Sequence, residues 1–253
     1  MSLFSKIVIG VIIYLVFLLV YLPANWLVSI VPLPNNVAIS GAEGTLWQGQ
    51  ASLVTIDQRQ IEQVSWQLSP WGLLVGKADI DFKIGNRATP VSGKGSISWS
   101  FSGLRANNIR FDLPDSFLLA GARLPFKTQI DGDVSLMVEI LEQGKPWCEQ
   151  LSGKLFLNNT NVKNQYGVYP LGNISLGLSC LDGQLKIATD ETQNVLGLTG
   201  SAILGESNLV KVSAKIKPTD AQPRDLREAL SFLGRQDSQG YYPINYQGVV
   251  PGL

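Results

Sequence analysis

The sequence contains no histidine among its 253 residues. This absence excludes Ser-His-Asp and Cys-His catalysis, zinc sites with imidazole ligands, and an imidazole general base. Two cysteines are too few for an all-thiolate zinc site. Twenty basic and twenty acidic residues give no net charge and form no long runs, so the sequence predicts no nucleic-acid partner. We expect a binding protein and not an enzyme, with no cofactor and no small-molecule substrate.

The candidate catalytic residues are two pairs of carboxylates, Asp79 with Asp81 and Asp131 with Asp133. Residues two apart in an extended segment point to the same side, so each pair has the spacing of a glycosidase-like acid–base pair or part of a calcium site. No nucleophile-plus-base motif accompanies them. We interpret both pairs as the solvated faces of strands and turns.

Long apolar runs are absent except at the N-terminus, where residues 7–22 are apolar without interruption. Residues 3–22 supply the roughly 20 residues that a helix needs to cross a bilayer core of about 30 Å. Leu22 occupies a position, two residues before Ala24, where a cleavable signal peptide needs a small residue. We therefore expect an uncleaved transmembrane anchor.

The charges around this segment predict its orientation. Lys6 precedes it, and the first carboxylate is Glu43, so the positive-inside tendency places the N-terminus in the cytoplasm. Aromatic rings at the far end favour the lipid–water boundary, and Pro23 is expected to end the helix. The anchor and its interfacial segment comprise residues 1–31, and the residues assigned to them are Ile7, Leu15, Tyr21, Leu22 and Trp26. Residues 32–253 then form a domain outside the cytoplasm.

Residues 32–253 alternate apolar and polar side chains in short segments separated by glycine or polar pairs, which is typical of antiparallel sheet. We predict a mainly β domain, either a sandwich or a curved sheet. The expected strands are 51–56, 64–68, 78–84, 97–101, 109–113, 126–130, 134–140, 153–157, 171–178, 185–187, 195–203 and 209–216. Residues 236–253 form either a last edge strand or a tail that orders against a partner.

Two short helices are expected within this pattern. Asp220 is a suitable cap for a helix over 221–233, and Gly234 is placed to end it. A single turn is predicted over 114–119, because Pro114 suits the first position of a helix.

The two cysteines, Cys148 and Cys180, are expected to form a disulfide in an oxidising compartment. Two buried free thiols are the alternative that the sequence leaves open. If the domain is divided, the polar, glycine- and proline-containing stretch 142–146 is the predicted boundary, which gives possible halves 32–143 and 144–253. Both cysteines would then lie in the second half.

Four aromatic residues are candidates for contact with a partner: Trp47, Trp71, Tyr242 and Tyr246. For Trp47 and Trp71, burial in the core is an equally weighted alternative. Trp66 and Trp99 alternate with other apolar residues, and we expect both to fill the core.

Several of these features occur together in one known family. The stretches Gly41-Ala-Glu-Gly-Thr-Leu-Trp-Gln-Gly49 and Trp66-Gln-Leu-Ser-Pro-Trp71, one cysteine pair, a Tyr-Pro-Ile near the end and an N-terminal spanning segment resemble the protein N family of the bacterial type II secretion system. The resemblance covers nearly the whole chain. It implies an accessory component of the inner membrane with a periplasmic domain, whose partners are other secretion components and the lipid bilayer. It supplies no catalytic residues.

Two functions remain open. In the first, the chain is a structural or interaction subunit whose exposed sheet edges accept strands from other secretion components. In the second, it is a periplasmic lipid-binding or lipid-transfer protein with an apolar groove formed by a curved sheet. Clean alternation along a strand fits both, because a one-sided core and an apolar concave face produce the same pattern.

Overall fold

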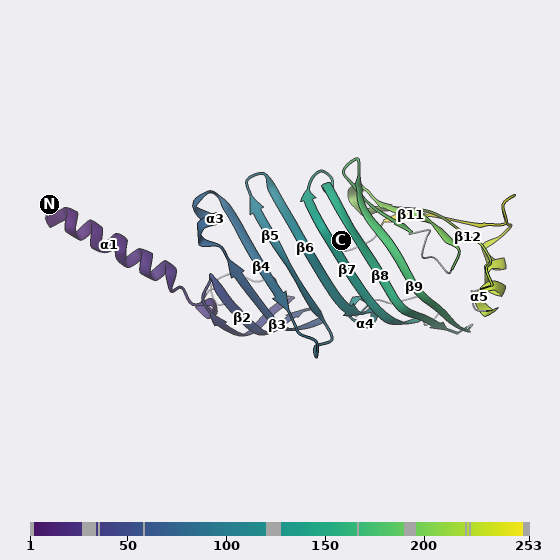
Figure 1. Cartoon of the computed structure of the whole chain (residues 1–253), viewed down its shortest axis with the longest axis horizontal. Coiled ribbons are helices and arrows are strands. Elements are labelled where there is room, and N and C mark those ends of the chain that lie inside the picture. The colour runs from purple at the N-terminus through teal and green to yellow at the C-terminus, as the bar shows by residue number, and fades with distance from the viewer. Residues whose placement is uncertain are drawn as a thin grey trace.

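The computed structural model describes residues 3–26, 34, 36–57, 59–119, 128–165, 167–189, 196–220, 222 and 224–249. Within these residues thirteen strands form one antiparallel sheet, and each strand pairs with the strands before and after it in the chain. The mainly β prediction is confirmed. Of the two predicted architectures, the structure has the curved sheet, and in Figure 1 β11 and β12 run at a steep angle to β4–β9.

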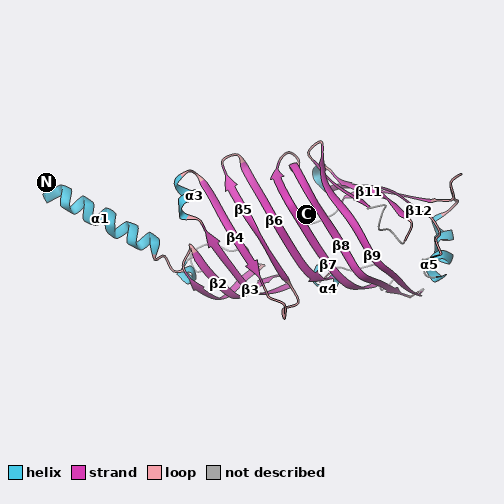
Figure 2. Ribbon diagram, in the orientation of Figure 1, coloured by secondary structure: helices cyan, strands magenta, loops and turns pink. Residues whose placement is uncertain are grey.

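The elements are named in chain order. The strands are β1 (Val37–Gly44), β2 (Gln48–Ile56), β3 (Arg59–Leu68), β4 (Lys77–Ile84), β5 (Ser92–Ser100), β6 (Gly103–Pro114), β7 (Gln129–Gln143), β8 (Cys148–Asn164), β9 (Gly167–Leu181), β10 (Gln184–Thr189), β11 (Leu198–Leu204), β12 (Leu209–Ile216) and β13 (Tyr242–Val249). The helices are α1 (Leu3–Val20), α3 (Pro70–Leu74), α4 (Asp115–Leu118) and α5 (Arg224–Ala229), with 3₁₀ turns η3 (Glu206–Asn208) and η4 (Leu230–Leu233). Figure 2 shows how few helices accompany the sheet.

Because the strands run alternately up and down, their connections gather at two opposite ends of the sheet. The end where β1, β3, β5 and β7 finish carries α3, and we call it the α3 end. The opposite end carries α4 between β6 and β7 and α5 between β12 and β13, and we call it the α4 end. These ends form the upper and lower edges of β4–β9 in Figure 1.

One side of the sheet is apolar from β3 to β13. Directly opposed residues of antiparallel strands share a face, so the register defines two overlapping rows. The first row is Leu68, Ile80, Ile97, Ala106, Leu141 and Leu151, and the second is Ile109, Val138, Gly153, Leu178, Ile187, Ala202, Val212 and Tyr246. We call the side that carries these rows the apolar face.

The described residues contain no second layer over the apolar face. The strands contact their neighbours in the sheet, while α3, α4 and α5 lie at the two ends. A small cluster of Ala106, Ile109 and Val138 is buried, and most other residues of the face are only half-buried. The accessible surface of 16794 Å² is well above the roughly 11,000 Å² expected of a compact 27.5 kDa protein. The protein therefore exposes much more surface than a compact fold of this size.

At the α4 end of the curved sheet, contacts join strands that are not neighbours. Arg59 at the start of β3 donates hydrogen bonds to the carbonyl oxygens of Phe117 (2.9 Å) and Leu118 (3.0 Å) in α4. This joins β3 to the β6–β7 connection across two intervening strands. In the C-terminal part of the sheet, α5 contacts β9 and η4 contacts β13. The helical segment formed by α5 and η4 therefore joins two strands that are not neighbours in the sheet.

The strand predictions were largely correct. The expected segment 209–216 coincides with β12, and the last segment is an edge strand, β13. The two segments expected over 126–130 and 134–140 belong to one strand, β7, although residues 126 and 127 lie outside the described residues. The strand β1 was not predicted.

The helix predictions were correct in part. The single turn is present as α4, where Pro114 is the N-cap and not the first helical residue. The C-terminal helical segment begins at Arg224, continues as η4, and ends at Gly234 as expected. Its first predicted residue, Ala221, lies outside the described residues. The helix α3 was not predicted.

At the N-terminus, residues Leu3–Val20 form the helix α1, and its described apolar side chains are exposed. Within the described part of the chain, no helix combines the length and the apolar character that a membrane crossing requires. The predicted transmembrane anchor, including Ile7, Leu15, Tyr21, Leu22 and Trp26, stays a prediction.

The proposed boundary between two halves falls in the connection between β7 and β8. These two strands pair from Gln129 opposite Lys163 to Gln143 opposite Cys148, which makes them one of the longest pairings in the described sheet. The divisions at residue 31 and at residue 143 stay predictions.

Candidate functional site

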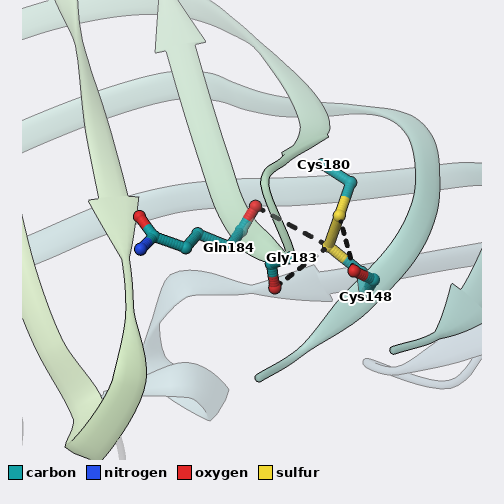
Figure 3. Close-up of a disulfide and its surroundings, with 4 residues drawn as sticks. All are labelled: Cys148, Cys180, Gly183 and Gln184. Atoms are coloured by element: carbon teal, nitrogen blue, oxygen red, sulfur yellow. Dashed lines mark hydrogen bonds between the residues drawn. A yellow bond between two sulfur atoms is a disulfide. The ribbon is translucent and has the colours of Figure 1, made fainter. Parts of the chain in front are cut away.

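The two cysteines form the predicted disulfide, with the Cα atoms of Cys148 and Cys180 6.0 Å apart. It lies at the α3 end, where β8 begins and β9 finishes (Figure 3). Cys148 is almost fully buried, and its Sγ lies 3.6 Å from the carbonyl oxygen of Gln184. The backbone N–H of Cys148 also donates to the carbonyl of Gly183 at 3.2 Å. The crosslink thus fixes β8 to the β9–β10 turn, and the alternative of free thiols is wrong.

The carboxylate pair on β4 lies on the polar side of the sheet. Ser98 Oγ donates to Asp79 at 2.5 Å, and Ser96 Oγ donates to Asp81. In the same polar row, Arg105 forms an ion pair of 2.8 Å with Glu142. These contacts agree with the interpretation that the pair belongs to a solvated strand face.

The second carboxylate pair lies near a carboxylate that sequence reasoning missed. Asp115 in α4 is 5% exposed, and its Oδ2 atom has no hydrogen-bond partner in the structure. Burial, followed by the negative charges of Asp133 and Asp131, raises the pKa of Asp115. No group of three or more potential ligands in the described residues is arranged to hold a metal ion. No sequence signal distinguishes Asp115 from an exposed helix-start carboxylate.

The predicted partner-contact residues lie in three places: α3, the β1–β2 turn and β13. Trp71 in α3 is 77% exposed, which rules out the alternative that it fills the core, and Trp47 in the β1–β2 turn is half-buried. Tyr242 and Tyr246 both lie on β13, where Tyr242 is half-buried and Tyr246 is exposed. The structure therefore does not bring the four residues together. Whether they contact a partner stays a prediction.

The two tryptophans that were expected to fill the core, Trp66 and Trp99, differ in their burial. Trp66 is half-buried, and its indole N–H donates to the carbonyl of Leu46 at 3.1 Å. Trp99 is 67% exposed, so the prediction that it fills the core was wrong. Alternation correctly assigned Trp99 to the apolar side of β5, but no layer of the described protein covers that side.

Within the described part of the chain, the sheet has two unpaired edges, β1 and β13. An unpaired strand presents backbone N–H and C=O groups that another extended segment can pair with. In β1, Gly41 and Gly44 adopt positive φ angles of 64° and 87°, which interrupt the extended conformation. No residue of β13 has a positive φ angle. In its φ angles the edge formed by β13 is therefore the more regular one, although Pro243 lacks a backbone N–H.

The last residues of the apolar N-terminal segment are attached to the sheet at the α3 end. The N–H of Leu46 donates to the carbonyl of Leu22 at 3.0 Å, and Pro23 forms an isolated bridge with Thr45. The end of β3 is linked to the same β1–β2 turn, because the N–H of Leu68 donates to the carbonyl of Trp47 at 2.7 Å. These bonds fix the point from which the N-terminal helix leaves the sheet.

These features define a class of protein: a single-layer antiparallel sheet with an uncovered apolar face, open edge strands and an N-terminal apolar helix. Such an arrangement is suited to binding extended or apolar partners.

Comparison with known sequences identifies the family within this class. Residues 35–245 match the family described as "Type II secretion system (T2SS), protein N". The chain is 32% identical over 240 residues to the type II secretion system protein N of Aeromonas hydrophila, covering 94% of both chains. It is 30% identical over 230 residues to that of Vibrio cholerae, covering 90% of this chain and 91% of the relative. The chain belongs to the type II secretion system protein N family, as its sequence motifs indicated. No solved structure matches it.

Proposed function

We propose that the protein is a bitopic component of the bacterial inner membrane, in which α1 crosses the bilayer and the sheet lies in the periplasm. The observation that carries this proposal is the surface of α1, whose described large apolar side chains are all exposed. A helix that is apolar all round is stable when it is buried in a protein core or in a membrane. Membership of the secretion family supports an envelope location for such a helix.

The flanks of α1, and the apolar run of the sequence that continues to Leu22, support a spanning position. The eighteen residues of α1 extend about 27 Å, close to the roughly 30 Å of a hydrocarbon core. Lys6 lies near its start, and the aromatic residues Tyr21 and Trp26 follow its end. Lipid-exposed aromatic rings at one end and a cation at the other suit an N-terminus in the cytoplasm.

Within the secretion machinery, we propose that the protein acts by binding and that the edge strand β13 accepts an extended segment of another component. Tyr246 on this strand is exposed, and no residue of β13 has a positive φ angle, so the strand is extended throughout, with Pro243 as its one residue that lacks a backbone N–H. Backbone hydrogen bonds would supply affinity, and exposed aromatic side chains would supply specificity.

Site-specific photocrosslinking in intact membranes tests this proposal. A crosslinker at Tyr246 should capture another inner-membrane or periplasmic secretion component, whereas one at Lys154, an exposed residue on a central strand, should not. Equal yields of the same product from both positions, or capture of lipid alone at Tyr246, would contradict binding at this edge.

A second candidate function is favoured by the uncovered apolar face. We propose as the alternative that this face holds the acyl chains of a lipid. Its second row passes without a charged side chain from Ile109 on β6 to Tyr246 on β13. Eight strands at about 4.8 Å spacing give this row a width of roughly 35 Å, and each buried CH₂ contributes about 0.8 kcal/mol.

Neighbouring residues on β9 provide a matched test of lipid binding. Leu178 lies on the apolar face, while Ser179 points to the opposite side. Purified full-length protein should retain co-purifying phospholipid, detected by native mass spectrometry. Leu178→Gln should reduce this lipid severalfold and Ser179→Gln should not. Equal lipid content in both variants and the parent chain would argue against an acyl-chain site.

A further inference from the structure

The exposed large apolar residues of the sheet are concentrated at the α3 end of β3–β6. They share high exposure and come from α3, from the turn that follows it, and from the adjoining ends of β5 and β6. They are Trp71, Leu73, Leu74, Val75, Trp99, Phe101 and Leu104. We call these residues the α3 patch. The turn residue Phe101 is fully exposed, and Leu74 is 77% exposed, which is costly for such side chains in water.

Local contacts connect the segments that carry the patch. Ser69 caps α3 by accepting a hydrogen bond from the N–H of Gly72. Gly76 ends the turn with a φ of 76°, and a Cβ atom at this position would lie 2.7 Å from the ring of Phe101. The β5–β6 turn therefore packs directly on the turn after α3, and Trp99 lies opposite Leu104 on the paired strands.

We propose that the α3 patch rests on the bilayer surface from which α1 emerges, and that it orients the sheet on the membrane. This inference relies on the proposed function of α1 as a membrane anchor. Leu22 is bonded to Leu46 in the β1–β2 turn, and β3, which leads into α3, pairs with β2 beside that turn. From β1 to β6 there are five strand spacings, so the whole patch lies within about 24 Å of the anchor's end.

The chemistry of the patch favours lipid over a soluble partner. All of its members are apolar or aromatic, and tryptophan and phenylalanine suit the boundary between headgroups and acyl chains. Lys77 follows the patch directly and is exposed, which suits anionic headgroups. A site so close to the emerging anchor would meet the bilayer before it could meet a freely diffusing protein.

Labelled full-length protein in nanodiscs that contain phosphatidylglycerol tests the proposal. The described cysteines are both in the disulfide, so a single introduced cysteine can carry an environment-sensitive fluorophore. Leu74→Cys and Phe101→Cys report on the patch. Phe232→Cys is the matched control, because Phe232 is also apolar and is 90% exposed but lies in the connection at the α4 end. Ile12→Cys reports on α1.

We expect iodide to quench the labels at positions 74 and 101 at least about threefold less than the label at position 232, because the former would be shielded by lipid. Adding Leu74→Ser should restore quenching at position 101. Quenching at 74 and 101 equal to that at 232, with position 12 protected, would overturn the inference and leave the anchor intact. Quenching at position 12 as strong as at 232 would overturn the anchor itself. Protection of the patch that requires added secretion components would also overturn the inference, in favour of a protein partner.

Discussion

Removal of the disulfide should destabilise the C-terminal part of the sheet. The perturbation is the double substitution Cys148→Ala and Cys180→Ala. The crosslink joins residues 32 apart in the sequence, and the loss of chain entropy in the unfolded state gives about 3.7 kcal/mol for a loop of that length. Because the sulfur of Cys148 is almost fully buried, its removal adds a packing loss of about 1 kcal/mol. Against a total stability of about 5–15 kcal/mol, this is a large fraction.

The topology predicts which strands are destabilised when the disulfide is removed. Every strand pairs only with its neighbours in sequence, so the sheet resembles a stacked array in which stability is passed between adjacent units. The disulfide joins β8 to β9 next to the β9–β10 turn. Opening should therefore begin in β8–β10, while β4 and β5 remain protected.

Hydrogen exchange by mass spectrometry, together with urea unfolding of the full chain in detergent, measures both effects. We expect a lower urea midpoint and faster exchange in β8–β10, with β4 and β5 as the internal control. The parent protein in reductant should lose the entropic part of the stability without the packing loss. An unchanged midpoint with unchanged exchange in β8–β10, in both the variant and the reduced protein, would refute the chain-entropy reasoning.

Three further predictions concern single residues. The raised pKa of Asp115 means that the folded protein binds this proton more tightly than the unfolded chain, so stability falls as pH rises from the ordinary value of 3.8 through the raised one. Asp115→Asn should remove this dependence and raise stability near neutral pH by about 1 kcal/mol, measured by urea titrations across pH; an unchanged pH profile would contradict it. Gly76→Ala should cost about 1–2 kcal/mol, because the residue has a φ of 76°, which strains any residue with a Cβ atom, and thermal unfolding that is unaffected would disprove this strain. Trp147→Phe should cost about 1 kcal/mol by removing the 2.7 Å hydrogen bond from the indole to the carbonyl of Gly205, detectable as faster exchange in the β11–β12 turn.

The sequence was sufficient to predict most strands because each residue in a strand reports directly on its side of the sheet. The segment 209–216 was predicted to the residue, since Val210, Val212 and Ala214 alternate with Lys211 and Ser213. The same pattern does not reveal whether a second layer covers the apolar side. For that reason the choice between sandwich and curved sheet stayed open, and the exposed Trp99 was assigned to the core.

Other misses have local causes. The helix α3 is five residues long and continuously apolar, so it has no helical periodicity, although Ser69 followed by Pro70 is a recognised start signal. In β1, the positive φ angles of Gly41 and Gly44 accompany a weak alternation that resembles a loop. The burial of Asp115 depends on how α4 sits beside β7, and no local pattern encodes that.

The two edge strands lie at different distances from the N-terminal helix. If α1 holds the N-terminal side of the sheet at the membrane, β1 lies beside the anchor, and β13 lies twelve strand spacings, or about 58 Å of strand-to-strand path, further along the sheet. The irregular edge is thus the one nearest the bilayer, where the interruptions at Gly41 and Gly44 reduce unwanted pairing. The regular edge of β13 is the one carried away from the anchor. A sheet in which one edge is interrupted by two glycines with positive φ angles and the other is not favours pairing at the second edge, as the proposed binding at β13 requires.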